Sequence, residues 1–168
     1  ATEKRIDLGI LRAPVSGHQS LTFHRLLNEA MLLALPSGHP LLKGANPTVS
    51  LGALKDERFI LVRRPGAPGM YANLIKACQN AGFEPKIAFE VERMLTNVSL
   101  VAAGEGISVV PASMRDVHRE SVVYCRIHDA RPRLLAPITL VRRTFNPSTP
   151  LQNFIGLARE LAGVYRKE

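Results

Sequence analysis

Arginine side chains follow several apolar runs of the chain, at the point where each run ends. Arg12 follows Ile6–Leu11, the pair Arg63-Arg64 closes the run that begins at Phe59, and Arg93 lies just beyond Lys86–Val91. A guanidinium group is permanently charged and can hold a carboxylate through two parallel hydrogen bonds. If these runs are strands, their carboxyl ends offer a place for a small anion.

A turn rich in proline and glycine, 65–69, follows Arg64 and leads into a predicted helix. The first N–H groups and the positive dipole end of a helix favour a carboxylate, and open α/β sheets bind ligands beyond the carboxyl ends of their strands. The alternative is that Arg63 and Arg64 are solvated charges at a strand end. The residues expected to bind the anion are Leu11, Arg12, Arg63, Arg64, Pro65, Gly66, Gly69, Glu92, Arg93 and Met94.

The sequence offers little support for catalysis, nucleotide binding or metal binding, and we predict no catalytic residues, metal or cofactor. Gly104-Glu105-Gly106 is not a dinucleotide fingerprint, because it follows a predicted helix and lacks the third glycine, so we interpret it as a helix stop. No phosphate-loop pattern and no serine in a nucleophile elbow occur. The histidines have no metal-ligand spacing and are interpreted as surface or capping residues: His18, His24, His39, His118 and His128.

Hydrophobic periodicity predicts the elements that must position these side chains. Apolar residues from Leu74 to Ala81 recur at helical spacing before Gly82, and a broad apolar stripe follows the turn-forming residues 146–150. Strands are expected at 6–11, 21–27, 31–35, 59–63, 86–91, 107–110, 122–126 and 138–142. Helices are expected at 74–81, 95–102 and 151–165, with a one-turn helix within 47–55, capped by Ser50, a short helix at 111–119, and a connector at 131–137.

The alternation of strand and helix between 59 and 110 predicts an α/β fold with parallel pairs and right-handed crossovers. With 168 residues, 46% of them hydrophobic, the chain can bury a core as one domain or two small lobes. No apolar run is long enough to span a membrane, and no secretory signal is visible. Cys78 and Cys125 lie far apart among apolar neighbours, which indicates two buried thiols in a reducing compartment.

The net charge of +8 is compatible with a nucleic acid or an anionic ligand as partner. The basic residues are spread along the chain, and only 5% of residues are aromatic, so no base-stacking surface is indicated. A scattered basic surface is the simpler interpretation.

Four segments in order along the chain resemble the effector-binding domain of LysR-type transcriptional regulators. One is Val98–Pro111, which resembles the family signature Leu-Val-x-x-Gly-x-Gly-Ile-x-x-x-Pro, and the four in this order are more specific than any one alone. The other three are Arg5–Leu11, Leu32–Leu41 with its His39-Pro40-Leu41 end, and Val49–Leu61. The turn 65–69 and Phe83-Glu84-Pro85 are most similar to the subgroup that senses aromatic acids and related catabolites.

The resemblance implies two Rossmann-like lobes joined by two crossovers, as in type-2 periplasmic binding proteins. Lobe one would comprise 1–57 plus 136–168, and lobe two 58–135. A small carboxylate effector, aromatic if the subgroup resemblance holds, would bind in the cleft between the lobes and modulate DNA binding, and the chain would not be an enzyme. Two alternatives stay open, a periplasmic solute-binding protein for a small anion and a two-lobed transferase or dehydratase.

The resemblance also implies partners. Such domains normally begin with a strand, a long helix and a second strand before the equivalent of Ile6–Leu11, and we expect this chain to be truncated there. DNA would be bound only through a winged helix-turn-helix absent from this chain, and RNA polymerase would be a partner of the full-length protein. A homodimer or homotetramer in the cytoplasm, without membrane contact, is expected.

Overall fold

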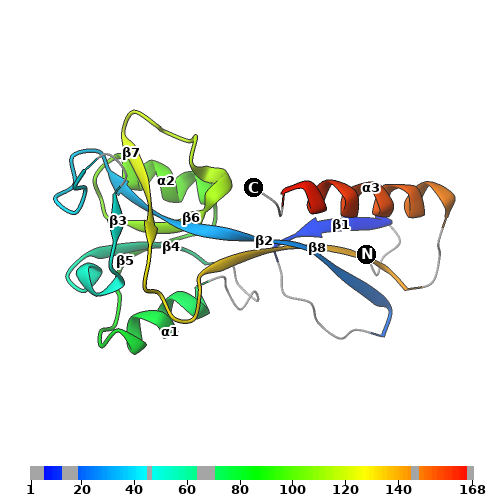
Figure 1. Ribbon diagram of the computed structural model, residues 1–168, viewed down its shortest axis with the longest axis horizontal. Helices are drawn as coiled ribbons and strands as arrows, with labels where there is room; N and C mark the ends of the chain where they lie inside the picture. The colour runs from blue at the N-terminus through cyan, green and yellow to red at the C-terminus, as the bar shows by residue number, and fades with distance from the viewer. Residues whose placement is uncertain (1–5, 13–18, 45–46, 64–70, 145–147, 166–168) are drawn as a thin grey trace. The chain divides into compact units, whose positions relative to one another are not determined.

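The computed structural model describes residues 6–12, 19–44, 47–63, 71–144 and 148–165 (Figure 1). It divides into two compact units, unit 1 with residues 1–29 and 136–168, and unit 2 with residues 30–135. The strands are β1 (Leu8–Leu11), β2 (Leu21–Pro36), β3 (Thr48–Val49), β4 (Arg58–Val62), β5 (Lys86–Val91), β6 (Ser108–Pro111), β7 (Val122–Ile127) and β8 (Leu135–Arg143). The helices are α1 (Ala72–Asn80), α2 (Met94–Ala102) and α3 (Thr149–Tyr165), with 3-10 turns η1 (Leu51–Leu54) and η2 (Ala112–Met114).

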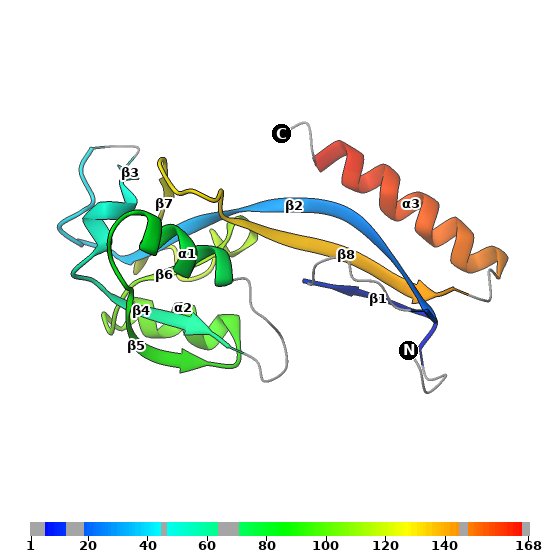
Figure 2. The same cartoon turned by 90° about the horizontal axis from the view of Figure 1, so that it is seen from below.

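Unit 1 is a small antiparallel sheet covered by one helix. β8 lies between β1 and the first part of β2, and β1 pairs with β8 in antiparallel register. Figures 1 and 2 show α3 lying along one face of these strands. Ala162 of α3 packs against Leu26 and Leu140, with Ile155 and Ala158 around them. The helix predicted at 151–165 is therefore confirmed, and its apolar stripe forms the core of the unit.

Unit 2 is the mixed α/β part of the chain. β4 and β5 are parallel, and one further parallel bridge joins Phe59 to Ile107 just before β6. β6 and β7 both run antiparallel to the second part of β2. α1 and α2 lie on opposite faces of the parallel strands (Figures 1 and 2). Val98 and Val101 of α2 pack against Ile60 in the core, so the predicted strand-helix alternation is confirmed.

One strand takes the place of two that the sequence predicts. The polar residues Asn28 and Glu29 indicate a break between 21–27 and 31–35, but β2 continues through them. Each has a partner in the sheet, because Arg25 donates to Asn28 Oδ1 at 2.6 Å and Arg12 donates to Glu29 Oε2 at 2.7 Å. Partnered polar side chains do not interrupt a strand, so that prediction was wrong.

The one-turn helix predicted within 47–55 is present as the 3-10 turn η1, and the short strand β3 precedes it. Ser50 is at the predicted cap position, but its side chain does not cap the helix. Its hydroxyl donates to Asp129 Oδ2 at 2.7 Å, and the Leu51 N–H donates to Asp129 Oδ1 at 2.8 Å. A distant carboxylate therefore caps this turn, and these two bonds lower the pKa of Asp129.

Two other boundaries also shift. The helix predicted within 111–119 is limited to the three residues of η2, and the connector predicted at 131–137 ends earlier, because β8 begins at Leu135.

The glycines of the Val98–Pro111 segment have two different physical roles. Gly104 follows α2 with φ +80°, a left-handed conformation in which glycine ends a helix without strain. Gly106 lies against β4, where an added Cβ would be 2.4 Å from the Arg58 carbonyl oxygen. The predicted helix stop is confirmed at Gly104, whereas Gly106 permits the close approach of two strands.

The division into units differs from the predicted lobes at one boundary. The predicted lobes divide the chain at 57/58 and 135/136, and the compact units divide it at 29/30 and 135/136. The reason is pairing, because Met31–Ala34 pair with β6 and Leu33–Pro36 pair with β7. The lobe that contains β4 and β5 therefore begins within β2.

Both cysteines are buried free thiols, as predicted. Burial raises the pKa of Cys125 to about 11, and burial together with nearby Glu84 raises the pKa of Cys78 to about 11. Of the helices in the described ranges, none is long and apolar enough to cross a membrane.

Candidate functional site

The carboxyl ends of β4 and β5 lie side by side in unit 2. Val62 is opposite Val91, and the Arg63 N–H donates to the Val91 carbonyl at 2.9 Å, which extends the pairing by one residue. The Arg63 side chain forms an exposed ion pair with Glu90, with Nη1 to Oε1 at 3.0 Å. The predicted strand end is present, but Arg63 already has a carboxylate partner in its own sheet.

The start of α2 follows directly from the end of β5. Arg93 is the N-cap residue, in an extended conformation and without a side-chain capping bond, and Met94 is the first helical residue. The first intrahelical bond runs from Asn97 N–H to the Arg93 carbonyl at 3.1 Å. The N–H groups of the first turn have no acceptor inside the helix, so this end can stabilise an anion beside the two strand ends.

Two buried side chains fix α2 and β6 to β4. Asn97 Nδ2 and Ser108 Oγ both donate to the Ile60 carbonyl, at 2.9 and 2.7 Å. These two bonds satisfy the Ile60 carbonyl. Ile107 forms one parallel bridge to β4, and the strand that follows it, β6, pairs with β2 instead. Since Asn97 and Ser108 are both fully buried, the start of α2 is held in a defined position next to β4.

Tyr71 is fixed to β6 by its hydroxyl group. It is 5% exposed, and its hydroxyl donates to the Val109 carbonyl at 3.2 Å. Burial raises the pKa of Tyr71 to about 12, so the phenol stays protonated and keeps this hydrogen bond at neutral pH. The segment between Arg63 and Tyr71 therefore begins and ends at residues bonded to the sheet of unit 2.

The remaining predicted residues fall into two groups. Leu11 and Arg12 belong to unit 1, where Leu11 is 42% exposed at the end of β1 and Arg12 forms its ion pair with Glu29. Arg64, Pro65, Gly66 and Gly69 lie outside the described residues. The structure thus brings together Arg63, Glu92, Arg93 and Met94 in unit 2. Within the described ranges no three potential metal-binding side chains gather.

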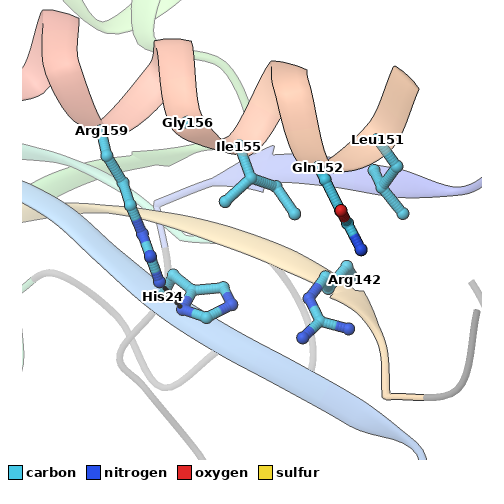
Figure 3. Close-up of a pocket in the computed structure, with 7 residues that line it drawn as sticks. All are labelled: His24, Arg142, Leu151, Gln152, Ile155, Gly156 and Arg159. Carbon is cyan, nitrogen blue, oxygen red and sulfur yellow. Dashed lines mark hydrogen bonds between the residues drawn. The ribbon is translucent and has the colours of Figure 1, made fainter. Parts of the chain in front are cut away.

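A pocket in unit 1 was missed by the sequence analysis (Figure 3). It has a volume of about 290 Å³ and lies between α3 and the strands β2 and β8. Its signal in the sequence is weak, because residues on three separate elements form it. The lining residues are His24, Arg142, Leu151, Gln152, Ile155, Gly156 and Arg159.

Arginines and a helix start at the ends of parallel strands, in the mixed α/β unit of this chain, define the class of small-molecule-binding α/β domains. Within that class, the chain belongs to the LysR substrate binding domain family, which it matches over residues 1–163. It is 30% identical over 153 residues to the transcriptional regulator AlsR of Bacillus subtilis, covering 91% of this chain and 49% of that protein. It is also 30% identical over 159 residues to BenM of Acinetobacter baylyi, covering 95% of this chain and 51% of BenM.

A solved structure extends the comparison to the fold. The BenM effector-binding domain with its effector benzoate superposes with a TM-score of 0.79 at 29% identity, covering 97% of this chain and 72% of that one. The predicted α/β fold of the type-2 periplasmic-binding-protein class and the predicted family are therefore confirmed. The chain is an effector-binding domain, and these relatives fit that interpretation and not the periplasmic alternative. It spans about half the length of the curated relatives it matches.

Proposed function

We propose that this chain is the sensory part of a LysR-type transcriptional regulator and that it binds a small aromatic carboxylate. The observation that carries the proposal is the junction in unit 2 where the ends of β4 and β5 meet the uncapped start of α2. Hydrogen-bond donors are concentrated there, and the Asn97 and Ser108 bonds hold them in place. A preorganised set of donors binds an anion without first losing conformational entropy.

The residues take distinct roles in this proposal. Arg64 is the bidentate partner of the carboxylate, because Arg63 is already paired with Glu90. Gly66 and Gly69 would offer backbone N–H groups to the anion, and Pro65, which has no N–H, would not donate. Glu92, Arg93 and Met94 would line the wall of the site in unit 2. The benzoate bound by the related BenM domain supports an aromatic acid as the ligand.

The remaining partners follow from the proposed regulatory role. Ligand binding in the chain would change the DNA affinity of a winged helix-turn-helix in the full-length regulator, which would work in the cytoplasm as a homodimer or homotetramer. RNA polymerase would be the partner in transcription. The domain would need no cofactor and catalyse no reaction, because its task is to bind the effector reversibly.

Replacement of Arg64 tests the assignment. We expect Arg64→Ala to weaken benzoate binding by roughly 1.5–3 kcal/mol, the range for a hydrogen bond to a charged group. Arg126→Ala, which removes an exposed arginine of β7, is the matched control and should leave the affinity unchanged. Isothermal titration calorimetry of the three proteins measures this directly. Equal affinities of wild type and Arg64→Ala would refute the assignment.

A further inference from the structure

The outer side of α3 carries an apolar stripe that the sheet of unit 1 does not cover. Its members are large side chains, each between 43% and 58% exposed: Phe154, Leu157, Leu161 and Val164. On the inner side of the same helix, Leu151 and Ala162 are buried. The broad apolar stripe of the sequence therefore has two parts, and only the inner part packs against the sheet.

The exposed stripe lies on the side of α3 that is toward β1. Arg159 contacts His24 of β2 at 2.7 Å. With 3.6 residues per turn, Leu157 and Leu161 project from the side of the helix opposite to Arg159. Since β8 lies between β1 and β2 in the sheet, the side of α3 away from β2 is the side of β1.

β1 extends the same apolar surface. Ile10 pairs with Leu140 in the antiparallel register, and paired residues point to the same face of a sheet. Leu140 belongs to one buried cluster with Ala162 of α3, so Ile10 is on the face that α3 covers, although it is 52% exposed. β1 is also the last strand in this sheet, and its outer edge has no neighbour among the described strands. We call Ile10 and the four exposed residues of α3 the α3–β1 face.

The α3–β1 face is large enough to form a contact. With roughly 200 Å² of accessible surface for each large apolar residue, the exposed fractions of the five residues amount to roughly 500 Å². Apolar patches of about 300–600 Å² on a single chain are often functional. If two copies covered this face against each other, they would bury about 1,000 Å², the lower limit for a specific interface.

The spacing of the stripe favours a second copy of the chain as the occupant. Its four residues on α3 are separated by three, four and three positions, the spacing of the a and d positions of a heptad. This spacing is the same in both directions along the helix, as a two-fold contact requires. Antiparallel packing of two α3 helices would place Leu157 against the partner's Leu161, and Phe154 against the partner's Val164.

We propose that the α3–β1 face is an interface between two copies of this chain, formed by antiparallel packing of α3 on α3 about a two-fold axis. No charged residue lies within the stripe, so no charge is buried unpaired at its centre. The face belongs to unit 1 and shares no residue with the junction of β4, β5 and α2. Because the contact is small, we expect a weak dimer with a Kd in the micromolar range.

Analytical ultracentrifugation of the whole chain measures this association and does not depend on the effector. We expect a reversible equilibrium between a monomer of 18.4 kDa and a dimer of twice that mass. Leu157→Glu places an unpaired charge in the contact and should weaken the dimer at least about tenfold. Leu95→Glu is the matched control, because it makes the same change at an exposed leucine of α2 in unit 2, and it should leave the dimer unchanged.

A mixture of two variants tests the antiparallel register and separates loss of the contact from misfolding. Leu161→Lys alone should also weaken the dimer at least about tenfold. Mixed with Leu157→Glu, it should restore dimers, because the two introduced charges have opposite signs and face each other across the axis. A chain that stays monomeric at submillimolar concentration, equal dissociation by Leu95→Glu and Leu157→Glu, or no association in the mixture would overturn the proposal.

Discussion

Replacing Gly106 by alanine places a methyl group against the backbone of β4. The new Cβ would be 2.4 Å from the Arg58 carbonyl oxygen and 3.3 Å from Ile60 Cγ1. A carbon and a carbonyl oxygen approach to about 3.3 Å, so the two segments must separate by about 0.9 Å. The same carbonyl accepts the Ile107 N–H at 2.8 Å, and the Ile60 N–H donates to Ile107 O at 2.8 Å. Both hydrogen bonds would exceed the usual limit of about 3.2 Å.

The free energy of unfolding should fall by about 2–3 kcal/mol. Two weakened hydrogen bonds account for about 1 kcal/mol each, and strain in the packed core adds roughly 1 kcal/mol or more. The lower entropy of alanine in the unfolded chain offsets about 0.4–1 kcal/mol. Gly52→Ala is the matched control in unit 2, because its Cβ would meet only Ser50 Oγ at 3.8 Å.

Urea unfolding followed by circular dichroism measures both variants. Gly106→Ala should unfold at clearly lower urea, with faster amide exchange at Ile60 and Ile107, whereas Gly52→Ala should stay within about 0.5 kcal/mol of wild type. If Gly106→Ala were as stable as Gly52→Ala, the close-approach explanation of this glycine would be incorrect.

Two further predictions follow from titratable groups in unit 2. The folded-state pKa of Asp129 is lowered, so its stabilising contribution is present above the unfolded-state pKa of about 3.9 and is lost as the pH falls through the lower folded-state value. Asp129→Asn should therefore reduce the stability near neutral pH and flatten its decline in acid, and identical pH profiles of the two proteins would contradict this. Cys78 and Cys125 are buried with pKa values of about 11, so a thiol reagent at neutral pH should label them only after unfolding in urea; rapid labelling of the native chain would show that they are accessible.

The sequence correctly predicted those helix and strand ends that are determined by residues close together in the chain. Gly82 and Gly104 have φ of +87° and +80° after α1 and α2, and the sequence places both stops correctly because glycine populates this conformation at little cost. β5 has the predicted bounds, Lys86–Val91. Its side chains Ile87 and Phe89 are 43% and 37% exposed, so the apolar face that indicated a strand is only partly covered by the described residues.

Contacts between distant residues could not be predicted in the same way. Glu29 of β2 has Arg12, 17 residues earlier, as its partner, and the cap of η1 depends on Asp129, 78 residues beyond Leu51. At the candidate site too, contacts between distant residues could not be predicted from the sequence. The strand end at Arg63 was predicted, but its pairing with Glu90 follows from the register of β4 and β5, which includes an irregularity between Phe59 and Ile60.

The central claim is that the chain senses a small carboxylate, and a matched titration tests it most directly. Calorimetry with aromatic acids and with their neutral amides compares ligands that differ mainly in charge. We predict saturable binding of at least one acid, with its amide at least about tenfold weaker, because the amide loses the charge-assisted bonds to arginine. Failure of every acid to bind, or equal affinities of an acid and its amide, would contradict the account.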